Sequence, residues 1–280
     1  MAICEWQMAN SDIENIYSRT VALIGGEAME RLKNSSVAVF GLGGVGGYTA
    51  EALIRAGVGK LTLIDGDVFT ESNLNRQLFA LKSTLGRNKA GVAKERLLDI
   101  NPEAEITARP VFFNAETAMD FDFNAFDYVV DAIDSVKDKT LLIETAVKAG
   151  TRIISSMGAG GKLCADFKTG DIFQTKGCPL ARVMRQKLRA VGITRLKTVY
   201  SETTAVKGKP VPSISYVPGL CGLTIAGEVI RELLKEHASP DSGYACQPAS
   251  VEYESNTLPR RFVNCCPTAA RLIFYRYCGM

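Results

Sequence analysis

Two kinds of apolar pattern alternate along the first 160 residues of this 280-residue chain. Short runs that contain apolar residues and have the length of strands occur at 35–40, 60–64, 106–113, 127–132 and 152–156, and the run at 127–132 has the apolar character of a buried parallel strand. Stretches with apolar residues at helical spacing separate them, at 45–56, 88–100 and 137–149. Strands that alternate with helices predict an α/β fold, a Rossmann-like doubly wound and mostly parallel sheet with right-handed crossovers.

The pattern changes on both sides of this region. Residues 13–32 predict one or two amphipathic helices, so 1–34 is expected to form an N-terminal helical segment. After Gly158, short strands at 162–167, 171–175 and 197–200 and a helix at 179–190 predict an antiparallel extension of the sheet. The segment 203–212 is predicted to be a mobile loop, and a long helix is predicted at 220–236. Residues 237–280 show no sustained periodicity and are expected to form a poorly ordered tail.

Composition narrows the class of protein. With 46% hydrophobic and 22% charged residues and a net charge of +3, the chain resembles an ordinary globular protein. No apolar run approaches the length of a membrane span, and residues 1–19 lack the apolar core of a signal peptide, so we expect a cytoplasmic protein. The eight cysteines form no Cys-x-x-Cys pair, so no zinc site is expected. The single histidine, His237, argues against histidine-dependent catalysis.

The most informative motif is the glycine-rich turn that follows the first predicted strand. It reads Phe40-Gly-Leu-Gly-Gly-Val-Gly-Gly47 and leads directly into a helix. Unpaired N–H groups at such a helix start attract phosphate, and the glycines admit a ligand close to the backbone. Asp65 ends the next strand, where a carboxylate can hold ribose hydroxyls. The glycine positions expected to hold a nucleotide are Gly41, Gly43, Gly44 and Gly46.

Two nucleotides fit such a turn, a dinucleotide redox cofactor and ATP. The polar residues downstream favour ATP, because Asn73, Arg76 and Lys89 suit a triphosphate, whose charge is costly to enclose without partners. Asp134 follows the buried strand at 127–132, and a carboxylate among phosphates is typical of a Mg²⁺ ligand. Ser135 follows it and is included in the predicted nucleotide site.

Taken together, the motifs resemble the adenylation domain of the ubiquitin-activating-type superfamily. They are Tyr-Ser-Arg19, Gly-Leu-Gly-Gly-Val-Gly, Leu-Ile-Asp65, Ser-Asn-Leu-Asn-Arg76-Gln, Gly-Arg-Asn-Lys89-Ala and Asp-Ala-Ile-Asp134-Ser, and the resemblance covers about 13–236. It implies that 35–236 is an ATP-binding adenylation domain. It also implies that the glycines around Gly44 cradle phosphates and that Asp65 holds the ribose.

The same resemblance implies the charged roles. Asn73, Arg76 and Lys89 would contact the phosphates and Asp134 would bind Mg²⁺. Arg19 would reach the ATP of the opposite subunit of a homodimer, so that Arg19, Arg76, Lys89 and Asp134 form the implied catalytic set.

Within the superfamily, three further stretches look like the tRNA threonylcarbamoyladenosine dehydratase branch. They are Gly-Ala-Gly-Gly-Lys162, Cys178-Pro-Leu-Ala-Arg-Val-Met-Arg and Val-Tyr-Ser-x-Thr203. The branch usually has an aspartate where this chain has Cys178. The resemblance implies an ATP-dependent cyclisation of threonylcarbamoyladenosine in tRNA through an acyl-adenylate, with a possible sulfur-relay partner. Activation of a ubiquitin-like sulfur-carrier protein is the alternative, and a nicotinamide-dependent dehydrogenase is a weaker one.

A basic segment supports a nucleic-acid substrate. Residues 172–201 contain seven basic side chains and no acidic one, and Lys207 and Lys209 extend the segment to 212. Such a run can be a solvated helix face, but beside an ATP site it fits a polyanion such as tRNA. The residues expected to contact tRNA are Arg182, Arg185, Lys187, Arg189, Arg195 and Lys197. Cys164, Cys178 and Cys221 are interpreted as packed thiols rather than nucleophiles.

Overall fold

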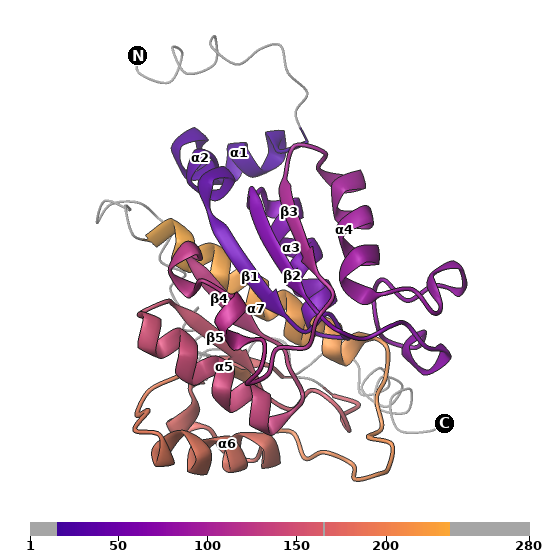
Figure 1. Cartoon of the computed structure of the whole chain (residues 1–280), viewed down its shortest axis with the longest axis vertical. Coiled ribbons are helices and arrows are strands. Elements are labelled where there is room, and N and C mark those ends of the chain that lie inside the picture. Colours follow the sequence, from indigo (N-terminus) through magenta and orange to yellow (C-terminus); the bar gives the residue numbers. More distant parts are fainter. Residues whose placement is uncertain (1–15, 165, 236–280) are drawn as a thin grey trace, which may run out of the picture. The chain divides into compact units, whose positions relative to one another are not determined.

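The computed structural model of the chain describes residues 16–164 and 166–235. Its central element is a seven-stranded sheet (Figure 1). The strand order is β3-β2-β1-β4-β5-β7-β6, and every neighbouring pair is parallel except β6 with β7. The strands are β1 (Ser36–Phe40), β2 (Lys60–Ile64), β3 (Glu105–Arg109), β4 (Tyr128–Asp131), β5 (Ile153–Ser156), β6 (Lys168–Asp171) and β7 (Lys197–Tyr200). The predicted fold, a mostly parallel sheet with an antiparallel extension, is confirmed.

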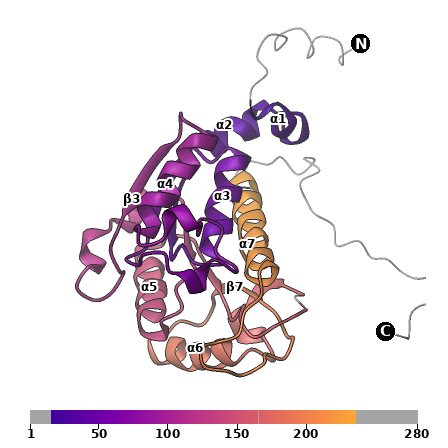
Figure 2. The same cartoon turned by 90° about the vertical axis from the view of Figure 1, so that its right-hand side faces the viewer.

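Helices cover both faces of the sheet. The α-helices are α1 (Ser18–Ile24), α2 (Gly26–Asn34), α3 (Gly46–Ala56), α4 (Lys89–Ile100), α5 (Val136–Ala149), α6 (Pro179–Ala190) and α7 (Tyr216–Lys235). Short 3₁₀ helices are η1 (Glu71–Asn73), η2 (Lys82–Thr84), η3 (Ala118–Asp120), η4 (Phe123–Ala125) and η5 (Ile172–Gln174). Helix α3 packs against α4 and α7, whereas α5 packs against α6. Figure 2 shows α5 and α7 on opposite sides of the sheet.

Alternate side chains of β1 point to opposite faces of the sheet and pack into two separate hydrophobic cores. Val37 and Val39 belong to the core under α3, α4 and α7. Ala38 and Phe40 belong to the core under α5 and α6, where Phe40 packs edge-on against Phe113 at 5.1 Å between ring centroids. Burying both faces explains why the strand is apolar at every position after Ser36. It also fixes the end of β1, from which the glycine turn departs.

The N-terminal helices pack at the end of the sheet where the strands begin (Figure 1). Leu32 is fully buried in the same core as α3, and its carbonyl accepts a hydrogen bond from Gly59 N at 3.0 Å. Tyr17 Oη donates to the carbonyl of Ile54, in the last turn of α3, at 3.0 Å. Helix α1 therefore lies near the C-terminal end of α3, far from the glycine turn at its start.

Two predicted strands of the extension are wrong. Residues 172–174 form the 3₁₀ helix η5, because the Asp171 carboxylate accepts a hydrogen bond from Phe173 N at 2.8 Å and turns the chain. No strand is present among the described residues of 162–167, and the strand that pairs with β7 is β6 instead. The described residues of 201–215 form neither helix nor strand, and the mobility expected for 203–212 stays a prediction. The predicted tail lies outside the described residues.

Candidate nucleotide site

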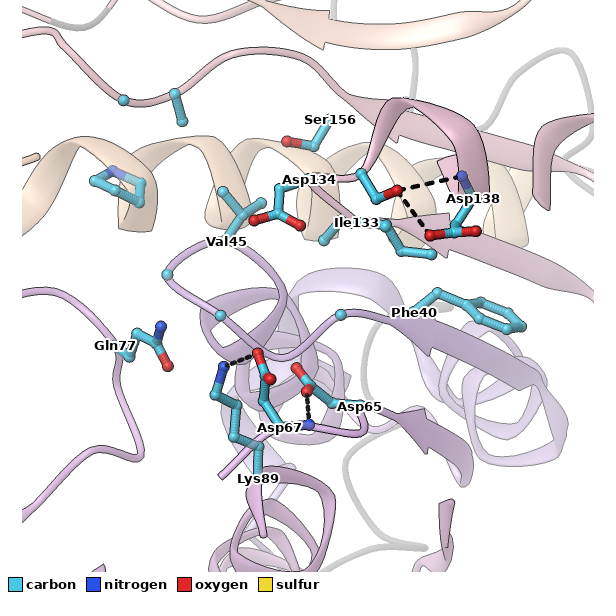
Figure 3. Close-up of a pocket in the computed structure, with 18 of the residues that line it drawn as sticks. Phe40, Val45, Asp65, Asp67, Gln77, Lys89, Ile133, Asp134, Asp138 and Ser156 are labelled. Carbon is cyan, nitrogen blue, oxygen red and sulfur yellow. Dashed lines mark hydrogen bonds and ion pairs between the residues drawn. The ribbon is translucent and has the colours of Figure 1, made fainter. Parts of the chain in front are cut away.

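A cavity of about 650 Å³ opens at the carboxyl ends of β1, β2, β4 and β5 (Figure 3). This is where an open α/β sheet places its ligand. Its walls come from the glycine turn after β1, the turn after β2, the turn after β4 and the segment after β5. Most of the predicted nucleotide residues line it: Gly41, Gly43, Gly44, Asp65, Arg76, Lys89, Asp134 and Ser135.

The glycine turn cannot carry side chains at two positions. Gly41 has φ +87°, and a Cβ there would lie 2.7 Å from the carbonyl oxygen of Ala132. A Cβ on Gly46 would lie 1.8 Å from the carbonyl oxygen of Gly41, so α3 starts in direct contact with the turn. The start of α3 therefore meets the cavity, and unpaired N–H groups of a first helical turn attract anions.

Asp65 joins two turns of the cavity wall. Its Oδ2 accepts from Leu42 N at 2.7 Å, and its Oδ1 accepts from Asp67 N at 2.8 Å. Burial raises the pKa of Asp65, against the lowering effect of the Lys89 charge and of these two hydrogen bonds. A carboxylate oxygen has more than one acceptor position, so each oxygen can still accept from a ligand hydroxyl.

The two cations of the cavity are held in different ways. Lys89 is only 6% exposed, and its Nζ lies 3.0 Å from Asp67 Oδ2. Arg76 is half-buried, and its Nη1 donates to the Ser72 carbonyl at 2.8 Å and to Asn75 Oδ1 at 2.9 Å. Both side chains line the cavity, so an anion there would meet two positive charges already held by neighbouring groups.

Asp134 lies across the glycine turn from Asp65, Asp67 and Lys89 (Figure 3). Its side chain is exposed to the cavity and has no hydrogen-bond or ion-pair partner within 16–164 and 166–235. The neighbouring Ser135 caps α5, and its Oγ donates to Asp138 Oδ2 at 2.7 Å. Asp134 therefore presents a free carboxylate, whereas Asp138 is already engaged.

Three residues predicted for the nucleotide site do not line the cavity: Gly46, which starts α3, Asn73 and Arg19. Asn73 Oδ1 accepts from Thr70 N at 3.2 Å in a capping box that holds η1, the element before Arg76. Arg19 is exposed on α1, next to Tyr17, at the opposite end of α3 from the cavity. The structure thus places Asn73 as a support of the segment that carries Arg76, and Arg19 outside the cavity of its own chain.

An ion pair that the sequence did not predict lies beneath the turn that carries Asp134. Asp131 and Lys139 are fully buried, with 2.8 Å between Lys139 Nζ and Asp131 Oδ2. Ser155 Oγ donates to the same carboxylate oxygen at 2.6 Å, and Ile133 N donates to Asp131 Oδ1 at 3.1 Å. The group fixes the backbone just before Asp134. The nearest signal in the sequence is an isolated lysine on the face of a helix that is otherwise apolar.

The basic segment divides into engaged and exposed residues. Arg185 Nη1 donates to the Thr175 carbonyl at 3.1 Å, and Lys197 Nζ lies 2.7 Å from Glu228 Oε1 and also contacts Glu232. These two predicted tRNA contacts are therefore occupied within the chain. The basic residues that remain exposed are Lys176, Arg182, Lys187, Arg189 and Arg195.

The described cysteines do not form a catalytic set. Cys221 is fully buried, and burial raises its pKa to about 12, above the range in which a thiolate forms. Cys178 is buried and Cys164 is exposed.

None of the helices described within 16–164 and 166–235 has the length and apolar character of a membrane span.

Comparison with known proteins gives the family. The model of the ThiF family matches residues 17–267, beyond residue 236 where the sequence motifs ended. The chain is 40% identical to the tRNA threonylcarbamoyladenosine dehydratase of Bacillus subtilis over 241 residues, which is 79% of this chain and 95% of that protein. The chain belongs to the ThiF family, in its tRNA threonylcarbamoyladenosine dehydratase branch.

Solved structures of this branch share the fold. The Escherichia coli dehydratase TcdA in complex with ATP aligns with a TM-score of 0.73 at 30% identity, over 78% of this chain and 93% of that one. Its complex with AMP aligns with a TM-score of 0.74, over 77% of this chain and 92% of that one. Those two structures therefore pair a similar fold with ATP and with AMP.

Proposed function

We propose that this ThiF-family protein dehydrates threonylcarbamoyladenosine in tRNA, using ATP to activate the carboxylate of the modification. The observation that carries the proposal is the cavity itself. It joins a glycine turn, two cations and a free carboxylate at the carboxyl ends of the strands, in a chain 40% identical to a dehydratase of this kind. ATP is the nucleotide of the E. coli relative's complex.

The first step is transfer of AMP to the substrate carboxylate. A carboxylate oxygen attacks the α-phosphorus of ATP, the bond to the β-phosphate breaks, and pyrophosphate leaves. Asp65 holds the ribose, and Arg76 and Lys89 stabilise the charge that moves onto the leaving phosphates. The product is an acyl-adenylate, in which the former carboxylate carbon has become electrophilic.

The second step closes a ring. A nucleophilic atom of the same modified nucleoside attacks the activated carbon, and AMP leaves with the oxygen that the substrate loses. Reactions between groups in one molecule reach effective concentrations of about 10⁵ M or more. A covalent cysteine intermediate is therefore unnecessary, in keeping with the protonated, buried Cys221.

The charge balance of the cavity calls for a further cation. Its lining contains the carboxylates of Asp65, Asp67, Asp134 and Asp138 and the cations of Arg76 and Lys89. ATP adds about four negative charges in a partly enclosed space, where uncompensated charge is costly. Mg²⁺ accepts one or two carboxylates together with phosphate oxygens, and the unpaired Asp134 carboxylate fits this donor set. Bound there, Mg²⁺ would neutralise phosphate charge.

A homodimer supplies a second source of positive charge. Arg19 lies at the far end of α3 from its own cavity and has no hydrogen-bond or ion-pair partner among the described residues. It is therefore available to the ATP of a second subunit. The exposed basic residues of 172–201 form the surface that meets tRNA phosphates, and Arg182 and Lys187 on α6 are two of them.

Exchange of labelled pyrophosphate into ATP tests this function. The exchange should require tRNA that carries threonylcarbamoyladenosine and should be absent with unmodified tRNA. Exchange that requires a carrier protein with a free C-terminus would instead identify a sulfur-carrier activator. Tight NADH binding without exchange would identify a dehydrogenase.

A further inference from the structure

Gln77 carries an unusual buried amide on the wall of the cavity. Its side chain is only 8% exposed and lines the cavity next to Arg76. Within the described part of the chain, only two buried side-chain polar atoms lack a hydrogen-bond partner, and Gln77 Oε1 is one of them. A buried polar atom without a partner costs free energy, so such atoms are rare and call for an explanation.

The backbone around Gln77 holds this amide in place. Gln77 N donates to the Asn73 carbonyl at 2.9 Å, and Asn73 itself is fixed by its capping box with Thr70. Gln77 Nε2 is the nearest atom to the place where a Cβ on Gly43 would lie, at 3.8 Å. The donor end of the amide therefore faces the glycine turn, and Nε2 has no hydrogen-bond partner among the described residues.

The position of Gln77 identifies the part of the nucleotide that it meets. In Figure 3, Lys89 Nζ lies between the carboxylate of Asp65 and the amide of Gln77, which points toward the turn. If Asp65 holds the ribose, the phosphates extend past Lys89 toward Gln77. The γ- and β-phosphates then lie nearest to Gln77.

We propose that Gln77 binds the β- and γ-phosphates of ATP through its amide N–H, and thus holds the group that leaves as pyrophosphate. The inference rests on the proposed function, because it assumes ATP in this cavity. The Nε2 donor already faces the glycine turn, so it can donate to a phosphate oxygen that lies against the turn without a change of side-chain orientation. A neutral donor binds the leaving phosphates without adding another fixed charge.

Calorimetric titration of Gln77→Ala with ATP and with AMP tests the contact. We expect the Kd for ATP to rise about tenfold, as for a lost hydrogen bond to a charged group, and the Kd for AMP to stay unchanged. Gln77→Glu should weaken ATP binding further, because a carboxylate repels the phosphates. Gln186→Ala, on the exposed surface of α6, is the matched control and should change neither Kd.

Two results would overturn the inference. One is an unchanged Kd for ATP in Gln77→Ala, and the other is an equal loss of ATP and AMP binding, which would indicate a general structural role. The two proposals can fail separately. A wild-type protein that binds ATP but shows no exchange with modified tRNA would contradict the proposed function, while the ATP-to-AMP comparison would still decide the role of Gln77. Absence of nucleotide binding in the wild type would contradict both.

Discussion

Two lysines of this protein, Lys89 and Lys197, look alike in the sequence and have different roles in the structure. Each is largely shielded from solvent and paired with carboxylate, Lys89 with Asp67 and Lys197 with Glu228 and Glu232. Lys89 starts α4 on the wall of the cavity, whereas Lys197 joins β7 to α7 and lines no described cavity. A basic residue therefore becomes a candidate for ligand binding through its place at the carboxyl ends of the strands, not through local charge density.

Removal of the cavity cations should give the largest effect. Arg76→Ala and Lys89→Ala should each lower the rate of tRNA-dependent pyrophosphate exchange by about 10²- to 10³-fold, the usual cost of removing a charge-stabilising group. The melting temperature should change little, because Arg76 is half-buried and the partner of Lys89, Asp67, is exposed. The pyrophosphate-exchange rate and the melting temperature should be measured on the same protein preparations. Full exchange activity in either variant would show that the cavity is not the ATP site.

Unlike Arg76 and Lys89, Arg19 is a cation that lies outside the cavity of its own chain. Arg19→Ala should lose exchange activity by about 10²-fold if the residue stabilises charge in a second subunit. Mixing inactive Arg19→Ala with inactive Lys89→Ala subunits should then restore part of the activity, because one cavity of a mixed dimer is intact. No restoration after verified subunit exchange would contradict a contribution from the opposite subunit.

Lys197 should affect stability rather than catalysis. Burial disfavours its charge, but hydrogen bonds to Glu228 and Glu232 outweigh burial and raise the pKa of Lys197. Lys197→Ala should lower the free energy of unfolding by about 1–3 kcal/mol, since two shielded carboxylates each lose one partner, although Glu228 keeps Arg231 and Glu232 keeps Tyr128. A folded-state pKa above the unfolded value means that this stabilisation is present below about pH 10.4 and is lost as the pH rises further.

Denaturant unfolding of wild type and Lys197→Ala at pH 8 and pH 11 measures this effect. The difference between the two proteins should shrink at the higher pH, while tRNA affinity at pH 8 stays the same. Weaker tRNA binding by a fully stable Lys197→Ala would return Lys197 to the set of tRNA-binding residues.

The exposed residues of α6 should give the smallest effect. Arg182→Ala and Lys187→Ala should each weaken tRNA binding a few-fold. Removing one cation that binds a phosphate should reduce the slope of log K against log salt concentration by roughly 0.7–0.9. Binding titrations at several salt concentrations measure this, and the affinity for ATP should stay unchanged. An unaltered slope in the double variant would place the tRNA on another face.

The sequence predicts the sheet domain best where local pattern and tertiary burial agree. The strand at Lys60–Ile64 and the helix at Pro179–Ala190 have their predicted bounds, because apolar runs, an N-terminal proline and helical spacing all point the same way. Residues 171–175 resemble a strand by composition, but the Asp171 side chain turns the chain into η5. A single side-chain hydrogen bond outweighs weak strand propensity there.

For the candidate site, the sequence predicts which residues lie at the ends of the strands but not how side chains from different elements pair. Gly41, Asp65 and Asp134 follow from their positions at the ends of strands. The pairing of Asp131 with Lys139 was not predictable, because it depends on how α5 lies over β4 and β5. The engagement of Arg185 and Lys197 depends likewise on neighbouring elements. Gln77 follows Arg76 in the sequence, but only the three-dimensional structure shows that its Oε1 is buried without a hydrogen-bond partner.

The most direct test of the central claim is a product analysis with purified protein, ATP, Mg²⁺ and tRNA that carries threonylcarbamoyladenosine. Mass spectrometry of the digested tRNA should show the modified nucleoside lighter by one water. One AMP and one pyrophosphate should appear for each nucleoside converted. An unchanged nucleoside mass, or ADP and phosphate as the products, would contradict adenylation of the tRNA carboxylate by this protein.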